Sequence, residues 1–399
     1  MATKKNILLI SFFWTGIRDF FLNRDEKFKG MPAFTNTFMK LVEHKNVGKV
    51  YVLFLGSKIS TTYHIPVKYQ TKLEVYGYSY SKGATALWAI LNLGIRALRI
   101  VVFKKIYLIY GHGPTSGIAG IISLITRIPN IRRIYGTFFC DKLQDSKTSI
   151  FRAHPLEYLA FSLPAKAIVI TNDGTKGDLV HDKIGHRTSP LHFWLNGIDK
   201  FEIAIPNIKE VGDKYGFDFS PDICYIARID KWKRQHLLLD ALKLAKDKGQ
   251  LYNTVIAGPV INQKYYDDML KTIQENGLGD TVKLIPGLTK TESLSVIKYA
   301  KVSTSFYDFS NLGNVFLESL SLGTPMLTEN INGSLDLIES NVYYNTTPSK
   351  PLEVVKTLET IFKDEDTLVL KSKQAVDFSH RTLLTWDERA DKELELLEL

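Results

Sequence analysis

Arg228 and Lys233 lie five residues apart, on either side of a turn that follows a predicted buried strand and precedes a predicted helix. Two side chains across such a turn can point the same way, and a guanidinium beside an ammonium suits a diphosphate group. Because Lys231 and Arg234 are their neighbours, the segment can also be interpreted as a solvated basic loop. The residue types therefore indicate a candidate diphosphate site, with a surface loop as the alternative.

A second candidate anion site lies in the segment Ser310-Asn311-Leu312-Gly313-Asn314-Val315-Phe316-Leu317-Glu318. Gly313 stands where a helix is predicted to begin, and the backbone N–H groups of a helix N-terminus attract anions. Glu318 falls one turn into that helix among apolar neighbours, where a carboxylate is costly unless a partner binds it. A pair of vicinal hydroxyl groups would be such a partner.

The segment Tyr110-Gly111-His112-Gly113-Pro114-Thr115-Ser116-Gly117 also follows a predicted strand and opens a predicted helix. Its glycines would let the backbone approach a phosphate, as in a loose form of the dinucleotide fingerprint. However, no acidic residue ends the next predicted strand to bind a ribose, and no GxxxxGKS or GxxxxGKT sequence occurs. We expect neither a nicotinamide enzyme nor a phosphate P-loop. His112 is then either a site residue or a loop histidine bonded to backbone.

The elements that carry these motifs are predicted from short runs of β-branched and aromatic residues, which indicate strands and alternate with helical patterns. In the first half the predicted strands are Asn6–Phe13, Val50–Leu55, Lys72–Tyr78, Ile106–Tyr110, Ile131–Tyr135, Ala167–Thr171 and Leu191–Leu195. In the second half they are Ile223–Ala227, Asn253–Ala257, Val282–Ile285, Val302–Phe306 and Pro325–Leu327. This alternation predicts an α/β protein with two doubly wound, Rossmann-like domains of parallel strands that face a cleft.

The length of the chain also indicates two domains, because 399 residues are too many for one ordinary hydrophobic core. The distribution of charge agrees with this division. Residues 1–200 hold 28 Lys+Arg and 12 Asp+Glu, a balance of +16, whereas residues 201–399 hold 23 and 30, a balance of −7. The basic residues are dispersed without a basic-aromatic run, so we do not expect nucleic-acid binding. Cys140 and Cys224, one in each half, exclude a disulfide framework and a thiolate metal site.

The most apolar segment is Leu87–Phe103, which contains Arg96 and Arg99 and is therefore not a credible membrane span. It is either a half-buried crossover helix or an amphipathic helix on a membrane surface, flanked by Lys104 and Lys105. The apolar run Ile7–Trp14 is too short for a signal peptide and is interpreted as the first buried strand. We therefore expect a cytoplasmic protein, with peripheral contact to the anionic inner face of the membrane through the basic first domain.

From Arg228 to Pro325 the chain resembles the nucleotide-binding domain of family 4 glycosyltransferases, which have the two-domain GT-B fold. The resemblance rests on the basic pair, the turn Pro286-Gly287, the run Ser321-Leu322-Gly323-Thr324-Pro325, the segment Asn196-Gly197-Ile198-Asp199, and Phe378-Ser379 with Trp386 near the end. It implies an acceptor-binding domain over residues 1–200 and a nucleotide-sugar-binding domain over 201–380. Residues 381–399 would form a helix that crosses back to the first domain.

The resemblance implies transfer of a sugar, as in hexosyltransferases, from a UDP- or GDP-linked donor with retention at the anomeric carbon. The acceptor would be a glycan or a lipid-linked glycan of cell-surface polysaccharide or glycolipid synthesis, and no metal or further cofactor is expected. Catalytic roles fall to Arg228, Lys233 and His112. Donor contacts fall to Gly30, Gly287, Leu288, Ser310, Asn311, Leu312, Gly313, Asn314, Val315 and Glu318.

The chain departs from the family pattern at several positions. Ser310 stands where the family has a glutamate, and Gly136-Thr137-Phe138-Phe139 stands where it has a second histidine. These departures leave a catalytically inactive glycosyltransferase-like partner open as an alternative. A GT-B-fold epimerase or phosphorylase is another, although an epimerase would need an acid/base pair in the cleft and a phosphorylase a lysine for pyridoxal phosphate.

Overall fold

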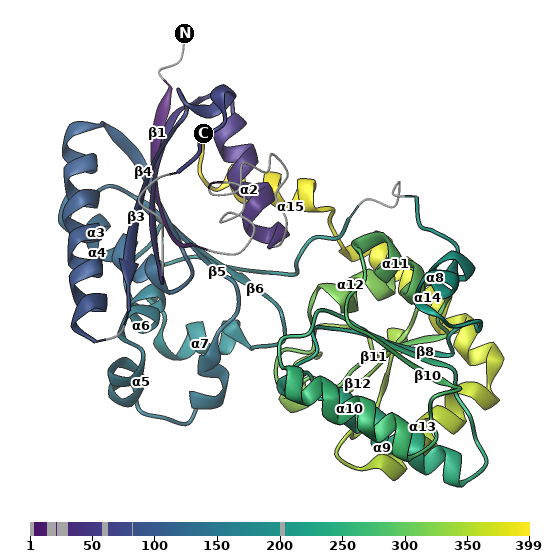
Figure 1. Cartoon of the computed structure of the whole chain (residues 1–399). Coiled ribbons are helices and arrows are strands. Elements are labelled where there is room, and N and C mark those ends of the chain that lie inside the picture. The colour runs from purple at the N-terminus through teal and green to yellow at the C-terminus, as the bar shows by residue number, and fades with distance from the viewer. Residues whose placement is uncertain (1–3, 14–20, 22–30, 58–62, 82, 200–203) are drawn as a thin grey trace. The chain divides into compact units, whose positions relative to one another are not determined.

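The computed structural model describes residues 4–13, 21, 31–57, 63–81, 83–199 and 204–399, which form two compact units (Figure 1). Unit 1 consists of Met1–Gly197 and Trp386–Leu399, and unit 2 consists of Ile198–Thr385. The chain therefore leaves unit 1 once and returns to it for its last fourteen residues. At the point of return a Cβ on Gly197 would lie 2.8 Å from Cα of Trp386, so only glycine allows the two segments to pass so closely.

Unit 1 is built on a parallel sheet of seven strands in the order β3-β2-β1-β4-β5-β6-β7. The strands are β1 (Lys5–Phe12), β2 (Val47–Ser57), β3 (Leu73–Tyr80), β4 (Ile106–His112), β5 (Asn130–Ile134), β6 (Ala167–Thr171) and β7 (Leu191–Trp194). The order reverses between β1 and β4, and open α/β sheets bind ligands beyond the strand ends at such a switch point. His112, the last residue of β4, lies there.

Helices cover both faces of this sheet. One face packs against α2 (Pro32–Glu43) and α15 (Trp386–Glu395), and the other against α3 (Ala84–Phe103) and α4 (Ser116–Thr126). Three shorter helices, α5 (Lys147–Ala153), α6 (Pro155–Ser162) and α7 (Gly177–Ile184), pack around β6. Because both faces are covered, most of the strands are apolar, as the sequence runs indicated, but β5 carries the buried side chains of Arg132 and Arg133.

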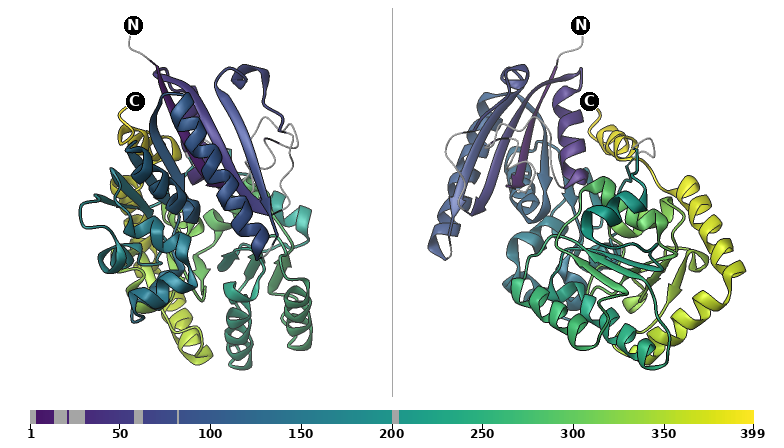
Figure 2. Two further views of the ribbon diagram at one scale, coloured as in Figure 1. Left: turned by 90° about the vertical axis from the view of Figure 1, so that its left-hand side faces the viewer. Right: turned by 45° about the vertical axis from the view of Figure 1, so that its right-hand side comes forward.

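Among the described residues α3 alone is long and apolar enough, by length and composition, to cross a membrane. In the structure one side of α3 packs on the sheet through Ala89, Leu93, Ala97 and Ile100, so it is a half-buried crossover helix. Figure 2, left, shows α3 in blue along the outside of the sheet. Its other side and the adjacent α4 expose nine large apolar side chains, which we call the α3–α4 face: Leu87, Trp88, Leu91, Ile95, Val102, Phe103, Ile121, Leu124 and Ile125.

Unit 2 has a parallel sheet of six strands in the order β10-β9-β8-β11-β12-β13. The strands are β8 (Ile223–Ile226), β9 (Thr254–Ala257), β10 (Val282–Ile285), β11 (Val302–Ser305), β12 (Met326–Thr328) and β13 (Tyr343–Asn345). Its helices are α8 (Ile208–Tyr215), α9 (Gln235–Asp247), α10 (Gln263–Glu275), α11 (Lys290–Tyr299), α12 (Asn314–Ser321), α13 (Pro351–Lys363) and α14 (Glu365–Thr382). The expected α/β class with two doubly wound parallel sheets is confirmed.

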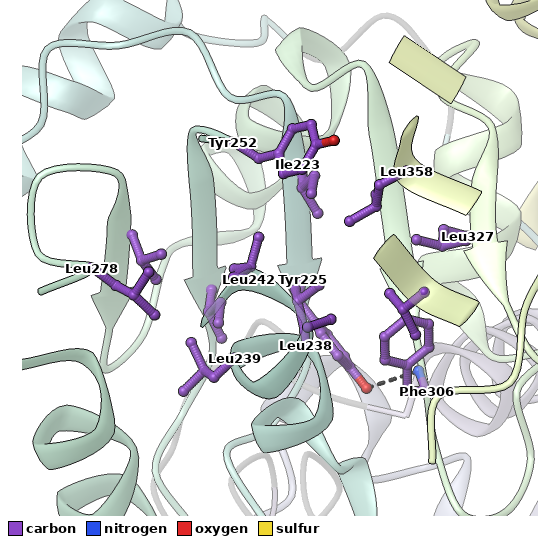
Figure 3. Close-up of a cluster of buried hydrophobic side chains, with 14 of the residues drawn as sticks. Ile223, Tyr225, Leu238, Leu239, Leu242, Tyr252, Leu278, Phe306, Leu327 and Leu358 are labelled. Carbon is purple, nitrogen blue, oxygen red and sulfur yellow. Dashed lines mark hydrogen bonds between the residues drawn. The ribbon is translucent and has the colours of Figure 1, made fainter. Parts of the chain in front are cut away.

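The sheet of unit 2 opens at its own switch point, between β8 and β11. These strands pair only at their beginnings, where Ile223 and Cys224 lie opposite Val302 and Ser303. Beyond that point the hydroxyl of Tyr225 accepts a hydrogen bond of 2.8 Å from the backbone N–H of Phe306, as the dashed line in Figure 3 marks. The same hydroxyl donates to the backbone carbonyl of Lys233. A buried tyrosine thus holds the segment after β8 beside the segment after β11.

A buried ion cluster fixes the C-terminal helix to unit 1. Glu393 of α15 is 1% exposed, and its Oε2 lies 3.1 Å from Nε of Arg133 and 3.0 Å from a terminal guanidinium nitrogen of Arg389. Its Oε1 accepts a hydrogen bond from the hydroxyl of Tyr110 in β4. Arg389 also donates to the backbone carbonyl of Leu195. The end of the chain is therefore joined to β5 by a buried ion pair and to β4 by a buried hydrogen bond.

Replacing Glu393 tests this anchor. Glu393→Ala leaves two guanidinium groups buried without their counter-charge, so we expect the free energy of unfolding of unit 1 to fall by about 3–5 kcal/mol. Urea denaturation followed by tryptophan fluorescence measures the loss, and hydrogen exchange of β4 and β5 assigns it to unit 1. Glu395→Ala, an exposed position of the same helix, should change stability by less than about 0.5 kcal/mol. Equal effects of the two variants would contradict the anchor.

Candidate functional site

The structure brings Arg228 and Lys233 together around one aromatic ring. Arg228 follows β8, and Lys233 ends a single 3-10 turn, Lys231–Lys233. Cζ of Arg228 lies 5.5 Å from the ring centroid of Trp232, and Nζ of Lys233 lies 3.7 Å from the same centroid. Both cations therefore stand at the carboxyl end of β8, where the sheet opens. The two predicted cations therefore lie near each other, and their binding of a diphosphate stays a prediction.

The four cations of this segment have different surroundings. Lys233 is buried, at 9% exposure, whereas Lys231 is exposed. Arg234 is held by carboxylates, at 3.5 Å from Asp308 and 3.8 Å from Glu329. Arg228 is exposed and forms no ion pair with any described residue. The alternative of a solvated basic loop therefore fits Lys231 but not Lys233.

Tyr307 is a site residue that the sequence did not indicate. It follows β11, is 5% exposed, and its ring centroid lies 3.2 Å from Nζ of Lys233, a cation–π contact. Burial raises the pKa of Tyr307, the hydrogen bond with Ser305 and the charge of Arg228 lower it, and Glu318 raises it. Arg228 and Glu318 therefore both lie close enough to influence one phenol. An aromatic residue directly after a predicted strand was the only signal in the sequence.

The glycine segment forms the predicted helix start. Gly313 precedes α12, no described side chain caps this helix, and a Cβ at Gly313 would meet no described atom within 4 Å. Leu312, the residue before Gly313, is buried, while Asn314 and Val315 in the first turn are partly exposed. The open end of α12 therefore offers backbone N–H groups to an anion.

Ser310 and Asn311 shape the loop before α12. The side chain of Asn311 accepts hydrogen bonds from Ser305 Oγ at 3.1 Å and from the Tyr307 N–H at 2.9 Å, and it donates to the Glu329 carbonyl at 3.1 Å. It therefore ties the loop to the ends of β11 and β12. Ser310 has a left-handed backbone, with φ of 63°, which is uncommon for a residue other than glycine. Direct contact of either residue with a donor stays a prediction.

Glu318 has a partner in unit 2 that the sequence did not indicate. Its carboxylate is 6% exposed and pairs with Lys290, whose Nζ also lies 3.2 Å from Asp199. Burial raises the pKa of Glu318, Lys290 lowers it, and Asp199 raises it. The turn at Gly287, with φ of 126°, and Leu288 lead from β10 to Lys290 at the start of α11. A half-exposed lysine therefore occupies the position that the sequence analysis gave to ligand hydroxyls.

His112 lies in unit 1 and is 1% exposed. Its Nδ1 is 2.7 Å from the hydroxyl of Tyr135, and its Nε2 has no hydrogen-bond partner among the described residues. Burial, and then the charge of Arg133, holds the pKa of His112 well below its usual range, so the ring is neutral at physiological pH. It is therefore a buried side chain with one free nitrogen, rather than a loop histidine bonded to backbone. Gly30 lies outside the described residues.

Over the described part of the chain, no group of three or more His, Cys, Asp or Glu side chains is placed to hold a metal ion. Asp308, an isolated carboxylate in the sequence, pairs with Arg234. Among the described charged residues near the strand ends of unit 2 are Arg228, Lys233 and the Glu318–Lys290 pair, together with Arg234 and its partners Asp308 and Glu329.

Unit 2 and the whole chain resemble known proteins. Residues 209–378, within unit 2, match the family model of glycosyl transferases group 1. The chain is 22% identical over 329 residues to the capsular polysaccharide biosynthesis glycosyltransferase CapM of Staphylococcus aureus, covering 76% of this chain and 80% of that protein.

Solved structures agree on the architecture. HepE of Anabaena, in complex with UDP and glucose, matches with a TM-score of 0.68 and 16% identity over 99% of each chain. Sucrose-phosphate synthase from Thermosynechococcus elongatus matches with a TM-score of 0.70 and 14% identity, over 99% of this chain and 98% of that one. The fold is therefore the GT-B fold of glycosyltransferases.

The raised pKa of Glu318 predicts a pH dependence of stability. Because burial favours the protonated form, Glu318 stabilises the fold fully below its ordinary pKa of about 4.5, and this contribution is lost as the pH rises through the raised pKa. The melting temperature of the wild-type chain minus that of Glu318→Gln should therefore fall between pH 4.5 and neutrality, in the absence of ligand. Removing the opposing cation with Lys290→Ala should move this fall to higher pH. A difference that grows with pH would contradict the assignment.

Proposed function

We propose that the protein is a hexosyltransferase of the family 4 kind. It would move a sugar from a nucleotide-diphosphate donor to a glycan or lipid-linked glycan, with retention at the anomeric carbon. The observation that carries the proposal is the convergence of Arg228 and Lys233 on Trp232 at the switch point of a unit that matches glycosyl transferases group 1. The name of CapM supports a role in cell-surface polysaccharide synthesis.

In this proposal unit 2 binds the donor and stabilises the leaving group. When the bond between the anomeric carbon and the diphosphate oxygen breaks, its electron pair moves onto the diphosphate, where negative charge grows. Arg228, Lys233 and the N–H groups at the start of α12 stabilise that charge. The acceptor oxygen forms the new bond to the anomeric carbon, and its proton passes to the departing diphosphate oxygen. The two side-chain cations supply the charge compensation, so we propose that no metal is needed.

Glu318 would bind the ribose of the donor. Two vicinal hydroxyl groups can donate to its two carboxylate oxygens, and Lys290, at 47% side-chain exposure, can turn away to admit them. Ser310 would contact the transferred sugar with a neutral hydroxyl where relatives have a carboxylate. We propose UDP as the first nucleotide to test, because HepE binds UDP together with glucose. GDP remains the second.

Unit 1 would bind the acceptor, and His112 would contact the transferred sugar. Because the imidazole is neutral and Nδ1 is engaged by Tyr135, its Nε2 can form one hydrogen bond to a sugar hydroxyl. The balance of +16 in residues 1–200 favours an acceptor held near anionic lipid, on the cytoplasmic face of a membrane.

The diphosphate role predicts a large effect of a single substitution. Lys233→Ala should lower the rate of sugar transfer, or of slow donor hydrolysis, by about 10²–10³-fold, the usual cost of removing one group that stabilises developing negative charge. Lys231→Ala, the exposed neighbour two residues earlier, is the matched control and should keep the wild-type rate. Equal rates for both variants would refute the role of Lys233.

The donor and the stereochemistry are tested together. The protein is incubated with UDP-, GDP- and ADP-sugars of known anomeric configuration, and thermal stabilisation and product formation are recorded. We expect stabilisation by a UDP- or GDP-sugar, and proton NMR should detect first a product with the anomeric configuration of the donor. An inverted product would refute retention. Binding of donors without turnover would favour an inactive partner protein, and release of an epimerised nucleotide-sugar would favour an epimerase.

A further inference from the structure

The α3–α4 face is the largest concentration of exposed apolar side chains in the described part of the molecule. Nine of the nineteen large hydrophobic residues that are exposed there lie on these two adjacent helices. Exposure reaches 70% at Val102 and 76% at Phe103. Scattered apolar residues need no explanation, but many exposed ones gathered on two neighbouring helices usually mark a binding surface.

The two helices of this face carry charged residues of one sign, and the nearby acidic residue Glu74 of β3 pairs with Lys49. The chain contains no acidic residue between Glu74 and Asp141, a stretch that includes both helices. Arg99 interrupts the exposed side of α3, Lys104 and Lys105 follow its end, and Arg127 follows the end of α4. The side chains of these four residues form no ion pair with a described residue. The face therefore combines apolar side chains with uncompensated positive charge.

A cavity of about 360 Å³ opens beside the face, between α3 and the edge strand β3. Its lining includes Trp88, Asn92, Arg96 and Arg99. The guanidinium of Arg96 lies over the ring of Tyr76, at 4.6 Å from the centroid. Two arginines in the lining of the cavity suit a phosphate, and the adjoining apolar side chains suit acyl chains.

We propose that the α3–α4 face binds an anionic phospholipid bilayer, with a headgroup phosphate in the cavity between Arg96 and Arg99. α3 would lie on the membrane rather than cross it, because its Ala89, Leu93, Ala97 and Ile100 are buried against the sheet. A second copy of the chain is a poor occupant, since a symmetric dimer would set like charges against each other. The surface does not depend on the proposed glycosyl transfer, which only gives it an acceptor to reach.

Flotation of the full chain with lipid vesicles tests the proposal. We expect binding to vesicles of phosphatidylethanolamine and phosphatidylglycerol, binding that weakens at high salt, and little binding to phosphatidylcholine alone. Equal binding to both kinds of vesicle, or binding to neither, would overturn it. Vesicle binding is measured without donor and UDP binding without vesicles, so failure of one proposal leaves the other standing.

Two pairs of variants locate the surface. Leu91→Ser with Phe103→Ser should weaken vesicle binding at least about tenfold, whereas Leu251→Ser with Leu337→Ser, two exposed apolar residues of unit 2, should not. Arg99→Gln should weaken it about fivefold, the contribution of one cation near an anionic surface. The control for Arg99→Gln is Arg187→Gln, because Arg187 is an exposed arginine that precedes β7 at the opposite edge of the sheet. Circular dichroism checks that each variant folds.

Light scattering separates a membrane from a protein partner. At micromolar concentration the wild-type chain should not form a dimer through the α3–α4 face. A dimer that Leu91→Ser with Phe103→Ser dissociates would assign the face to a second copy and overturn the proposal.

Discussion

A buried carboxylate must be paired, and in unit 1 this requirement joins the end of the chain to the centre of the sheet. Glu393 holds Arg133 and Arg389 and accepts a hydrogen bond from Tyr110. The guanidinium of Arg133 in turn lies 4.7 Å from the ring centroid of Tyr135, whose hydroxyl contacts His112. The surroundings of His112, at the end of β4, are therefore built in part by a helix more than 270 residues further along the sequence.

The buried carboxylate of unit 2, Glu318, has different partners from Glu393 of unit 1. Glu393 is paired with two buried arginines, and because the carboxylate is itself buried, no ligand can replace them. Its role is therefore structural. Glu318 has one lysine partner that is half-exposed, and burial still raises the pKa of the carboxyl group. Such a pair can open at small cost, because the lysine can return to water while hydroxyl groups of a ligand replace it. The same physical requirement thus produces an anchor in one unit and a candidate binding group in the other.

The strands were the most predictable part of the fold. Every predicted strand appears, with its ends displaced by at most three residues, because a strand covered on both faces is rich in apolar residues over most of its length. β13 was not predicted, since Tyr343–Asn345 is short and only partly buried. The cationic pair Arg228 and Lys233 was predictable because both residues belong to one turn. Lys290 and Tyr307 were not, because they reach the site from α11 and from the end of β11.

The sequence by itself therefore determined the alternation of strands and helices, the cationic turn after β8, and the glycine at which α12 begins. Each of these follows from residues close together along the chain. Only the tertiary structure decided that Arg234 is held by Asp308 and Glu329 while Lys233 lies under Tyr307, and which side of α3 packs on the sheet. The physical reason is that burial and charge pairing depend on which distant segments the strand order makes neighbours, and a local pattern does not contain that order.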